Sequence, residues 1–259
     1  MSTILFSTSR TITTATATTE AAGYPATNVG LPQIARMWRS TSTSAQTITI
    51  TISSAACKGV FFTNCNFSAA TIEYDDSGWV SLGTFNTRED VRLGRRYGAK
   101  DIGSTGVTTT QFRITPSGSP TDGVAYWYIG AIYVFGARYQ LERSPNLDEV
   151  STVDRNVDLR RLANGRTVAF ARNQYDGRAY RMSWVFQQSE AAGSVYPIAQ
   201  VIGSARVAGT PVGLIWPHYY LPQTADPDTG VFQLGEESIE ESDRGYRVRE
   251  TSVMLEEVY

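Results

Sequence analysis

Apolar and polar residues alternate with a period of two along residues 66–79, and this stretch is the clearest structural signal in the chain. Apolar side chains, including Ile72 and Tyr74, take every second position, and polar residues fill the positions between them. A period of two gives a strand one apolar face. The cluster Asp75-Asp76-Ser77-Gly78 favours a turn, after which Trp79 begins the return. This stretch therefore predicts a β-hairpin that closes a sandwich, with Trp79 in its core.

Three further stretches predict strands in the same half of the chain. Residues 46–52 alternate Thr with Ile, and residues 111–114 resume the alternation. Residues 125–135 are apolar at consecutive positions, which is typical of a strand that is buried on both faces. We expect one central strand there, or two strands that pivot at Gly130.

The second half of the chain also has the pattern of a β domain. Residues 167–170 and 179–186 flank Asp176-Gly177, and an Asp-Gly pair between two such runs predicts a hairpin. Residues 188–200 are the one candidate for a short helix, ending near Pro197. Further short strands are expected at 213–216, 231–234 and 245–249.

The predicted fold class is all-β, with two β-sandwich or jelly-roll-like domains and at most one or two short helices. The Thr-rich residues 1–22 have little to bury, so we expect an extended N-terminal arm or an edge strand. A charged, proline-broken segment follows Glu142 and indicates a domain boundary. We therefore assign 23–142 to a first β-sandwich and 147–259 to a second β domain.

Composition narrows the classes of partner. The chain has 259 residues, an apolar fraction of 41%, a charged fraction of 19% and a formal charge of −2. These values are typical of a soluble globular protein, and they supply no broad basic field for nucleic acid. The N-terminus lacks a signal-peptide pattern, and the longest apolar run is too short to cross a bilayer. We expect no nucleic-acid partner, no membrane insertion, and buried, reduced thiols at Cys57 and Cys65.

Candidate catalytic and metal-binding groups are sparse. His218 is the only histidine, and no Gly-x-Ser-x-Gly pentapeptide accompanies it. The adjacent carboxylates of Glu236-Glu237 and Glu240-Glu241 point to opposite faces of a strand, which does not suit a glycosidase pair. Asp75-Asp76-Ser77 offers oxygen ligands, but turn formation already explains it. We therefore predict no catalytic residue, no metal site, no cofactor and no enzymatic activity.

Two polar segments are instead candidates for contact with a partner. Residues 86–106 are polar and rich in arginine and glycine, which predicts a long loop between strands. Arginines in such a loop suit ion pairs with acidic groups of a neighbouring subunit. Residues 216–220, with one tryptophan and two tyrosines, are expected to form an aromatic loop. The candidate partner-contact residues are Arg88, Arg92, Arg95, Arg96, Trp216, His218, Tyr219 and Tyr220.

Several marks together resemble a known fold family. Residues 24–28, the segment Trp38-Arg39-Ser40, the strand at 47–52, Asn66-Phe67-Ser68 and the turn Ser77-Gly78-Trp79 follow one another in the chain. In this order they resemble a galactose-binding-domain-like (discoidin-type) jelly roll. Together with the second β half, the chain is similar to minor tail and distal tail (tail-tip) proteins of long-tailed bacteriophages. The likeness carries no catalytic residues.

That resemblance implies a structural protein of the virion tail tip or baseplate, assembled in the host cytoplasm. Such a protein would form a homo-oligomeric ring and join the tail tube to the hub or fibres. The alternative is a carbohydrate-binding module that adheres to a host surface glycan, because Trp216, Tyr219 and Tyr220 have rings that stack on sugars. Fold analogy alone does not decide between the two functions.

Overall fold

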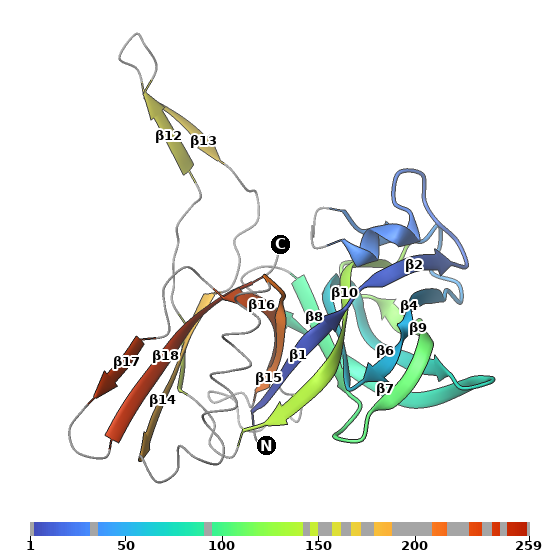
Figure 1. Cartoon of the computed structure of the whole chain (residues 1–259). Coiled ribbons are helices and arrows are strands. Elements are labelled where there is room, and N and C mark those ends of the chain that lie inside the picture. The colour runs from blue at the N-terminus through green and yellow to red at the C-terminus, as the bar shows by residue number, and fades with distance from the viewer. Residues whose placement is uncertain are drawn as a thin grey trace.

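The structure of the protein is a computed structural model of the whole chain (Figure 1). It describes residues 3–31, 36–90 and 95–141, and beyond them the segments 146–149, 157–161, 167–171, 179–187, 209–216, 228–234, 240–243 and 248–257. Within these residues the elements are antiparallel strands, and the helical element is one short 3-10 helix, η1 (Ala26–Gly30). The predicted all-β fold class is confirmed.

The first 141 residues build two antiparallel layers that face each other. One layer contains β1 (Ile4–Arg10), β10 (Tyr128–Gln140), β5 (Gly59–Cys65) and β8 (Arg95–Asp101), and β3 (Trp38–Arg39) pairs with β10. The other layer contains β6 (Phe67–Asp75), β9 (Val107–Pro120), β4 (Ile48–Cys57) and β2 (Ile12–Ala17). The long strand β7 (Trp79–Asp90) joins the layers, because its first part pairs with β6 and its last part pairs with β8.

The core between the layers follows from the period of two. Ile48, Ile50 and Ile52 of β4 are buried, and the threonines between them point outward. β5 and β10 close the core from the opposite layer with alternate residues such as Phe62 and Val134. Each fully buried aliphatic or aromatic side chain of this kind contributes about 1.5–3 kcal/mol to folding.

The predicted hairpin around residues 66–79 is confirmed. β6 pairs with β7 in a register that places Asp75 opposite Trp79. Ser77 and Gly78 take positive φ angles of 57° and 150°, and the Asp75 carboxylate accepts a hydrogen bond of 3.1 Å from the Gly78 N–H. The acidic cluster therefore forms the turn, as its composition predicts.

The apolar run at 125–135 becomes the central strand β10, and it is buried on both faces. One set of its side chains enters the core of the sandwich. The alternate set, with Tyr133 and Phe135, meets Phe6 of β1 and Phe61 of β5 in a second apolar cluster. β15 (Val212–Trp216) and β16 (Asp228–Leu234) contribute Ile215 and Val231 to that cluster, and β1 lies between β10 and β15 (Figure 1). The second β region thus covers the back of the first sandwich.

Residues of the predicted N-terminal segment 1–22 belong to these sheets. β1 pairs with β10 and β15. β2 pairs with β4 and forms the edge of the layer that contains β6, β9 and β4. The domain boundaries at 22, 142 and 147 stay predictions.

The hairpin predicted around Asp176-Gly177 is wrong. β13 (Thr167–Ala171) pairs with β12 (Val157–Arg161), whereas β14 (Ala179–Gln187) pairs with β11 (Asn146–Glu149) and β18 (Val248–Glu257). β17 (Glu240–Asp243) also pairs with β18. The sequence between β12 and β13 contains Asn164-Gly165, an equally strong hairpin signal with a shorter connection. The predicted helix at 188–200 lies outside the described residues.

The long loop predicted at 86–106 is also wrong for most of its length. β7 continues to Asp90, and β8 occupies residues 95–101 between β7 and β5. Polar side chains suit these strands because β7 and β8 pair acidic with basic residues, with Glu89 opposite Arg96. Among the described residues no helix is long and apolar enough to span a membrane.

Candidate functional site

One end of the first sandwich gathers tyrosine, arginine and carboxylate side chains. The connection from β2 to β4, the junction between β5 and β6, and the connection from β9 to β10 all meet there. The blue segment that contains β2 and the coiled η1 marks this end of the sandwich in Figure 1. The loop-end cluster, as we name it, consists of Tyr24, Arg39, Asn66, Asp122, Tyr126 and Tyr128.

Arg39 is held in the cluster by the short strand β3. The preceding Trp38 is fully buried, and its ring N–H donates to the Thr19 carbonyl at 3.1 Å. Adjacent residues of a strand point to opposite sides, so a buried Trp38 turns Arg39 outward. The Arg39 backbone N–H also donates to the Tyr24 carbonyl at 3.2 Å, which brings Tyr24 beside it.

The Arg39 guanidinium lies between two tyrosine rings. Its Cζ is 4.4 Å from the centroid of the Tyr24 ring and 3.9 Å from that of the Tyr126 ring. All three side chains are half-buried. Each cation–π contact of this kind contributes about 0.5–2 kcal/mol, depending on its exposure. Arg39 Nε is buried, and among the described residues it has no hydrogen-bond partner.

Asn66 ties the other side of the cluster together. It is only 1% exposed, and its amide nitrogen donates to the Tyr126 carbonyl at 2.9 Å and to the Asp122 carboxylate at 3.2 Å. Its amide oxygen accepts the Tyr128 N–H at 2.9 Å. Thr121 adds two bonds to the Asn66 carbonyl. One buried amide therefore fixes the positions of Asp122, Tyr126 and Tyr128.

The chemistry of the cluster is that of a polar ligand site with aromatic walls. Burial, and next the charge of Asp122, raise the pKa of Tyr128 well above its ordinary value, so its hydroxyl stays protonated. Asp122 is exposed and supplies acceptors, whereas Arg39 supplies only donors. Tyrosine rings add apolar surface with a polar edge. A few fixed polar groups among aromatic walls are typical of sites for small polar molecules.

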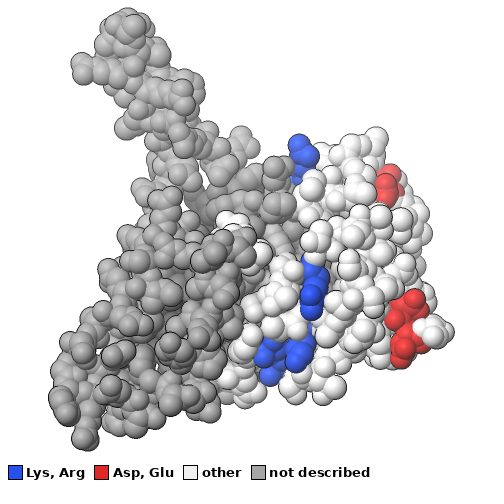
Figure 2. Space-filling model, viewed as in Figure 1, with Lys and Arg blue, Asp and Glu red and all other residues white. Residues whose placement is uncertain are grey.

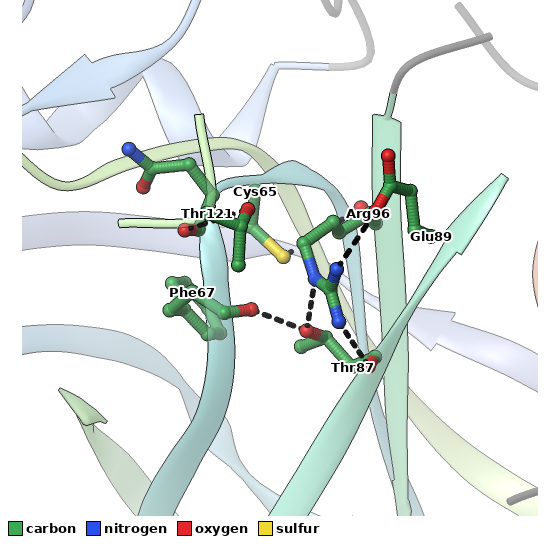
Figure 3. Close-up of polar contacts among 7 residues, drawn as sticks. Cys65, Phe67, Thr87, Glu89, Arg96 and Thr121 are labelled. Carbon is green, nitrogen blue, oxygen red and sulfur yellow. Dashed lines mark hydrogen bonds and ion pairs between the residues drawn. The ribbon is translucent and has the colours of Figure 1, made fainter. Parts of the chain in front are cut away.

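Three of the arginines predicted as partner contacts, Arg88, Arg95 and Arg96, lie on β7 and β8, and Arg96 has its acceptors within the chain. Figure 3 shows Arg96 donating to the Thr87 hydroxyl at 3.0 Å, to the Thr87 carbonyl at 2.9 Å and to Glu89 at 3.2 Å. The Thr87 hydroxyl in turn donates to the Phe67 carbonyl. Arg96 thus links β7 and β8 and is already provided with acceptors.

The other predicted contact residues fall into three groups. Arg88 is half-buried on β7, and Arg95 is 6% exposed on β8. Trp216 ends β15 and is 4% exposed, with its ring 6.0 Å from that of Phe232, so its side chain belongs to the interior of this chain. Arg92, His218, Tyr219 and Tyr220 lie outside the described residues, and the use of all eight as contacts stays a prediction.

The prediction that Trp79 is a core residue is wrong. Trp79 is 38% exposed, and Arg113 covers its ring with Cζ 4.4 Å from the centroid. Arg113 also donates to the Glu73 carboxylate at 2.6 Å. Trp79 follows the exposed turn at the tip of the hairpin, where the facing layer no longer covers the sheet, so an arginine from β9 packs on it instead.

Groups suited to metal or thiol chemistry are not gathered in the described part of the chain. No cluster of three or more His, Cys, Asp or Glu side chains occurs among those residues. Cys57 and Cys65 are buried and free, as predicted. Burial raises the pKa of Cys57 to about 11 and that of Cys65 to about 12, so both thiols are protonated and unreactive at neutral pH.

Sequence reasoning did not identify the loop-end cluster as a site. Tyr24, Trp38-Arg39 and Asn66 were noted only as marks of a fold. The available signal was Asn66, a polar residue at the end of an apolar run. A polar side chain that is buried at such a place needs hydrogen-bond partners from elsewhere in the chain.

The comparisons with known proteins found similar solved structures but no family. No family model and no curated protein matches the chain. The family 32 carbohydrate-binding module of Clostridium perfringens NanJ, solved with galactose, is 16% identical, and the match covers 47% of this chain and 92% of that one with a TM-score of 0.40. A chitosan-binding module from Paenibacillus sp. IK-5 is 23% identical over 48% of this chain and 94% of that one, with a TM-score of 0.38.

The lectin binding domain of Lectinolysin, complexed with Lewis b, gives a similar result. It is 9% identical over 51% of this chain and 99% of that one, with a TM-score of 0.41. Each match covers about half of this chain, and scores at this level carry no conclusion about its ligand. None of these three structures is a phage tail protein, so the tail-tip resemblance stays a prediction.

Proposed function

We propose that the chain binds carbohydrate through the loop-end cluster of its first sandwich. The observation that carries the proposal is the Arg39 guanidinium held between the half-exposed rings of Tyr24 and Tyr126, in the same cluster as the exposed residue Asp122, which Asn66 holds. A saccharide has apolar ring faces and a rim of hydroxyl groups. Tyrosine rings suit the faces, and fixed donors and acceptors suit the rim.

The rest of the described surface favours a small polar ligand over a protein partner. A stable protein interface buries about 800 Å² on each partner and has an apolar centre. Among the described residues, the large hydrophobic side chains that are exposed are Leu31, Trp79 and Val80. Trp79 and Val80 lie at the tip of the β6–β7 hairpin, so they do not extend the loop-end cluster into a broad apolar patch.

Charge on the described surface does not favour nucleic acid. On the face shown in Figure 2, basic side chains lie in a few patches near the border with the grey part, and acidic side chains lie near the outer edge of the described surface. A nucleic-acid site needs a continuous basic stripe with stacking platforms. The face in view lacks such a stripe in its described part.

A glycan array probed with the labelled full chain tests the proposal, followed by calorimetric titration of the best ligand. We expect Tyr126→Ala to lower the affinity about tenfold or more, because one wall of the site and the ring that orients Arg39 are lost.

The matched control is Trp79→Ala, which removes an exposed aromatic at the opposite end of β6, roughly 27 Å away for eight strand residues. This variant should bind as the wild-type chain does. If no array glycan binds at high protein concentration, or if the two variants lose affinity equally, the proposal is wrong.

A ring-forming role in a phage tail tip is a separate proposal, based on the resemblance alone. It assigns the protein to the virion and requires self-association and contacts with tube, hub or fibre proteins. Carbohydrate binding at a tail tip is compatible with it. Mass spectrometry of purified particles and the molar mass in solution test this role, and a monomer that is absent from particles would contradict it.

A further inference from the structure

Arg39 carries a charge that the described residues do not neutralise. Its buried Nε has no hydrogen-bond partner, and its guanidinium has no ion pair within residues 3–31, 36–90 and 95–141. Glu20 and Asp122 are acidic residues of the same end, but their carboxylates accept from the Ala26 N–H at 3.1 Å and from Asn66 at 3.2 Å. A partly buried cation without a counter-charge requires an explanation.

Three other half-buried arginines of the first sandwich are paired with carboxylates. Arg96 lies 3.2 Å from Glu89, Arg113 lies 2.6 Å from Glu73, and Arg138 lies 2.9 Å from Asp101. Arg10 is also half-buried and its Nε is also without a partner, but its terminal nitrogen donates to the Ala56 carbonyl at 3.2 Å. Arg39 has neither kind of acceptor among the described residues, and it lies inside the site that we propose for carbohydrate.

The two tyrosines restrict how Arg39 can be approached. Tyr24 and Tyr126 lie over the guanidinium, so its faces are occupied. Nε is buried, which leaves the four N–H donors of the two terminal nitrogens. Two terminal nitrogens in one plane match the two oxygens of a carboxylate, and charge-assisted pairs of this kind are about twice as strong as neutral hydrogen bonds.

We infer that the ligand of the loop-end cluster is an acidic saccharide whose carboxylate binds Arg39. This inference rests on the proposed function and names the ligand class within it. Uronic acids and sialic acids share the required chemistry, namely a pyranose ring that bears a carboxylate. The sugar ring packs beside Tyr126, and its hydroxyl groups donate to Asp122.

Calorimetric titration of the full chain with matched acidic and neutral probes tests the inference. One pair is trigalacturonate and the corresponding neutral galactose trisaccharide, and the other is sialyllactose and lactose. We expect one of the two acidic probes to bind about tenfold or more tightly than its neutral partner. Raising the salt from about 50 to 500 mM should reduce that preference, because ions screen the pair.

Two substitutions assign the preference to Arg39. Arg39→Gln should abolish the preference for the acidic probe, because it should weaken binding of the acidic probe about tenfold more than binding of the neutral probe. Arg39→Lys keeps the charge without the planar fork, so it should retain part of the preference. The control is Arg113→Gln, which removes an arginine at the same 4.4 Å distance from an aromatic ring but at the other end of the sandwich.

The outcomes separate the inference from the proposed function. If acidic and neutral probes bind equally well, or if Arg39→Gln keeps the acidic preference, the inference is wrong while carbohydrate binding stands. If neither probe pair binds and the glycan array is negative, the proposed function fails as well. The salt series on the wild-type chain needs no variant, so a poorly folded Arg39→Gln protein would not prevent the test.

Discussion

Two arginines of the first sandwich lie against aromatic rings, and they differ in what else they contact. At the hairpin end Arg113 lies over Trp79 and is bound to Glu73 at 2.6 Å. At the loop end Arg39 lies between Tyr24 and Tyr126 and has no carboxylate among the described residues. The first arrangement is complete within the chain. The second leaves charge and donors for a ligand.

Whether each arginine has a carboxylate partner follows from its position in the sheets. Arg113 is in the middle of β9, and the register of the sheet places Glu73 of β6 directly opposite. Cross-strand neighbours in a regular sheet lie about 4.5–5.5 Å apart, so such a pair forms readily. Arg39 is in the two-residue strand β3, where the residue opposite it on β10 is Tyr128 and not a carboxylate. Binding residues are found disproportionately on loops that a rigid scaffold positions.

The largest effect is expected from removing the amide that holds the loop end together. Asn66→Ala breaks three side-chain hydrogen bonds and leaves the Tyr128 N–H and Tyr126 carbonyl without their partner. We expect the free energy of unfolding to fall by about 2–4 kcal/mol. Urea unfolding measures the change, with Asn86→Ala on the exposed side of β7 as the control. Equal effects of the two substitutions would show that the loop end is not held by Asn66.

A smaller effect is expected on the rates at which the two buried thiols, at opposite ends of the first sandwich, react with a thiol reagent. Cys65 adjoins Asn66, whereas Cys57 lies at the opposite end of the sandwich. Burial raises the pKa of Cys65 to about 12 and that of Cys57 to about 11, so Cys57 should react faster with a thiol reagent at pH 8. Mass spectrometry of the labelled peptides gives the order. Faster labelling of Cys65 would mean that the loop end opens more readily than the hairpin end.

The smallest effect concerns the Glu73–Arg113 pair. The hydrogen bond from Arg113 lowers the Glu73 pKa in the folded chain. The stability from this pair is therefore present above the unfolded pKa of about 4.3 and is lost as the pH falls through the lower folded pKa. Glu73→Gln should cost about 0.3–1 kcal/mol at pH 7, as expected for a surface pair.

Unfolding of wild type and Glu73→Gln at both pH 7 and pH 3 checks this sign. The difference in unfolding free energy between the two proteins should shrink at pH 3. A difference of the same size at both pH values would mean that the carboxylate charge does not stabilise the hairpin end, and the comparison with Arg39 would lose its basis.

Much of the first sandwich was predictable from the sequence because its strands are long and regularly patterned. The isoleucines at 48, 50 and 52 had to share one face, and the turn residues at 75–78 had to reverse the chain. Strand partners were predicted less well. Two hairpin signals, Asn164-Gly165 and Asp176-Gly177, compete in the second half, and only the pairing of β12 with β13 decides between them.

The candidate site was beyond sequence reasoning because its residues come from separate connections. Tyr24, Arg39 and Tyr126 have no common spacing, and each alone is an ordinary polar or aromatic residue. The arginine-rich segment around Arg96 is easier to recognise in the sequence. In the fold, however, Glu89 and Thr87 already accept hydrogen bonds from the Arg96 guanidinium. A cluster of charge in sequence does not report whether the fold supplies partners.

The sequence by itself determined the hairpin from Asn66 to Trp79, the all-β class and the buried state of the two cysteines, because a period of two and local turn chemistry act within a few residues. Only the tertiary structure decided that Trp79 stays exposed and that Arg39 has no counter-charge among the described residues. Each outcome depends on which distant segment of the chain lies opposite the residue. Strand register and loop packing determine that segment, and no local sequence pattern encodes them.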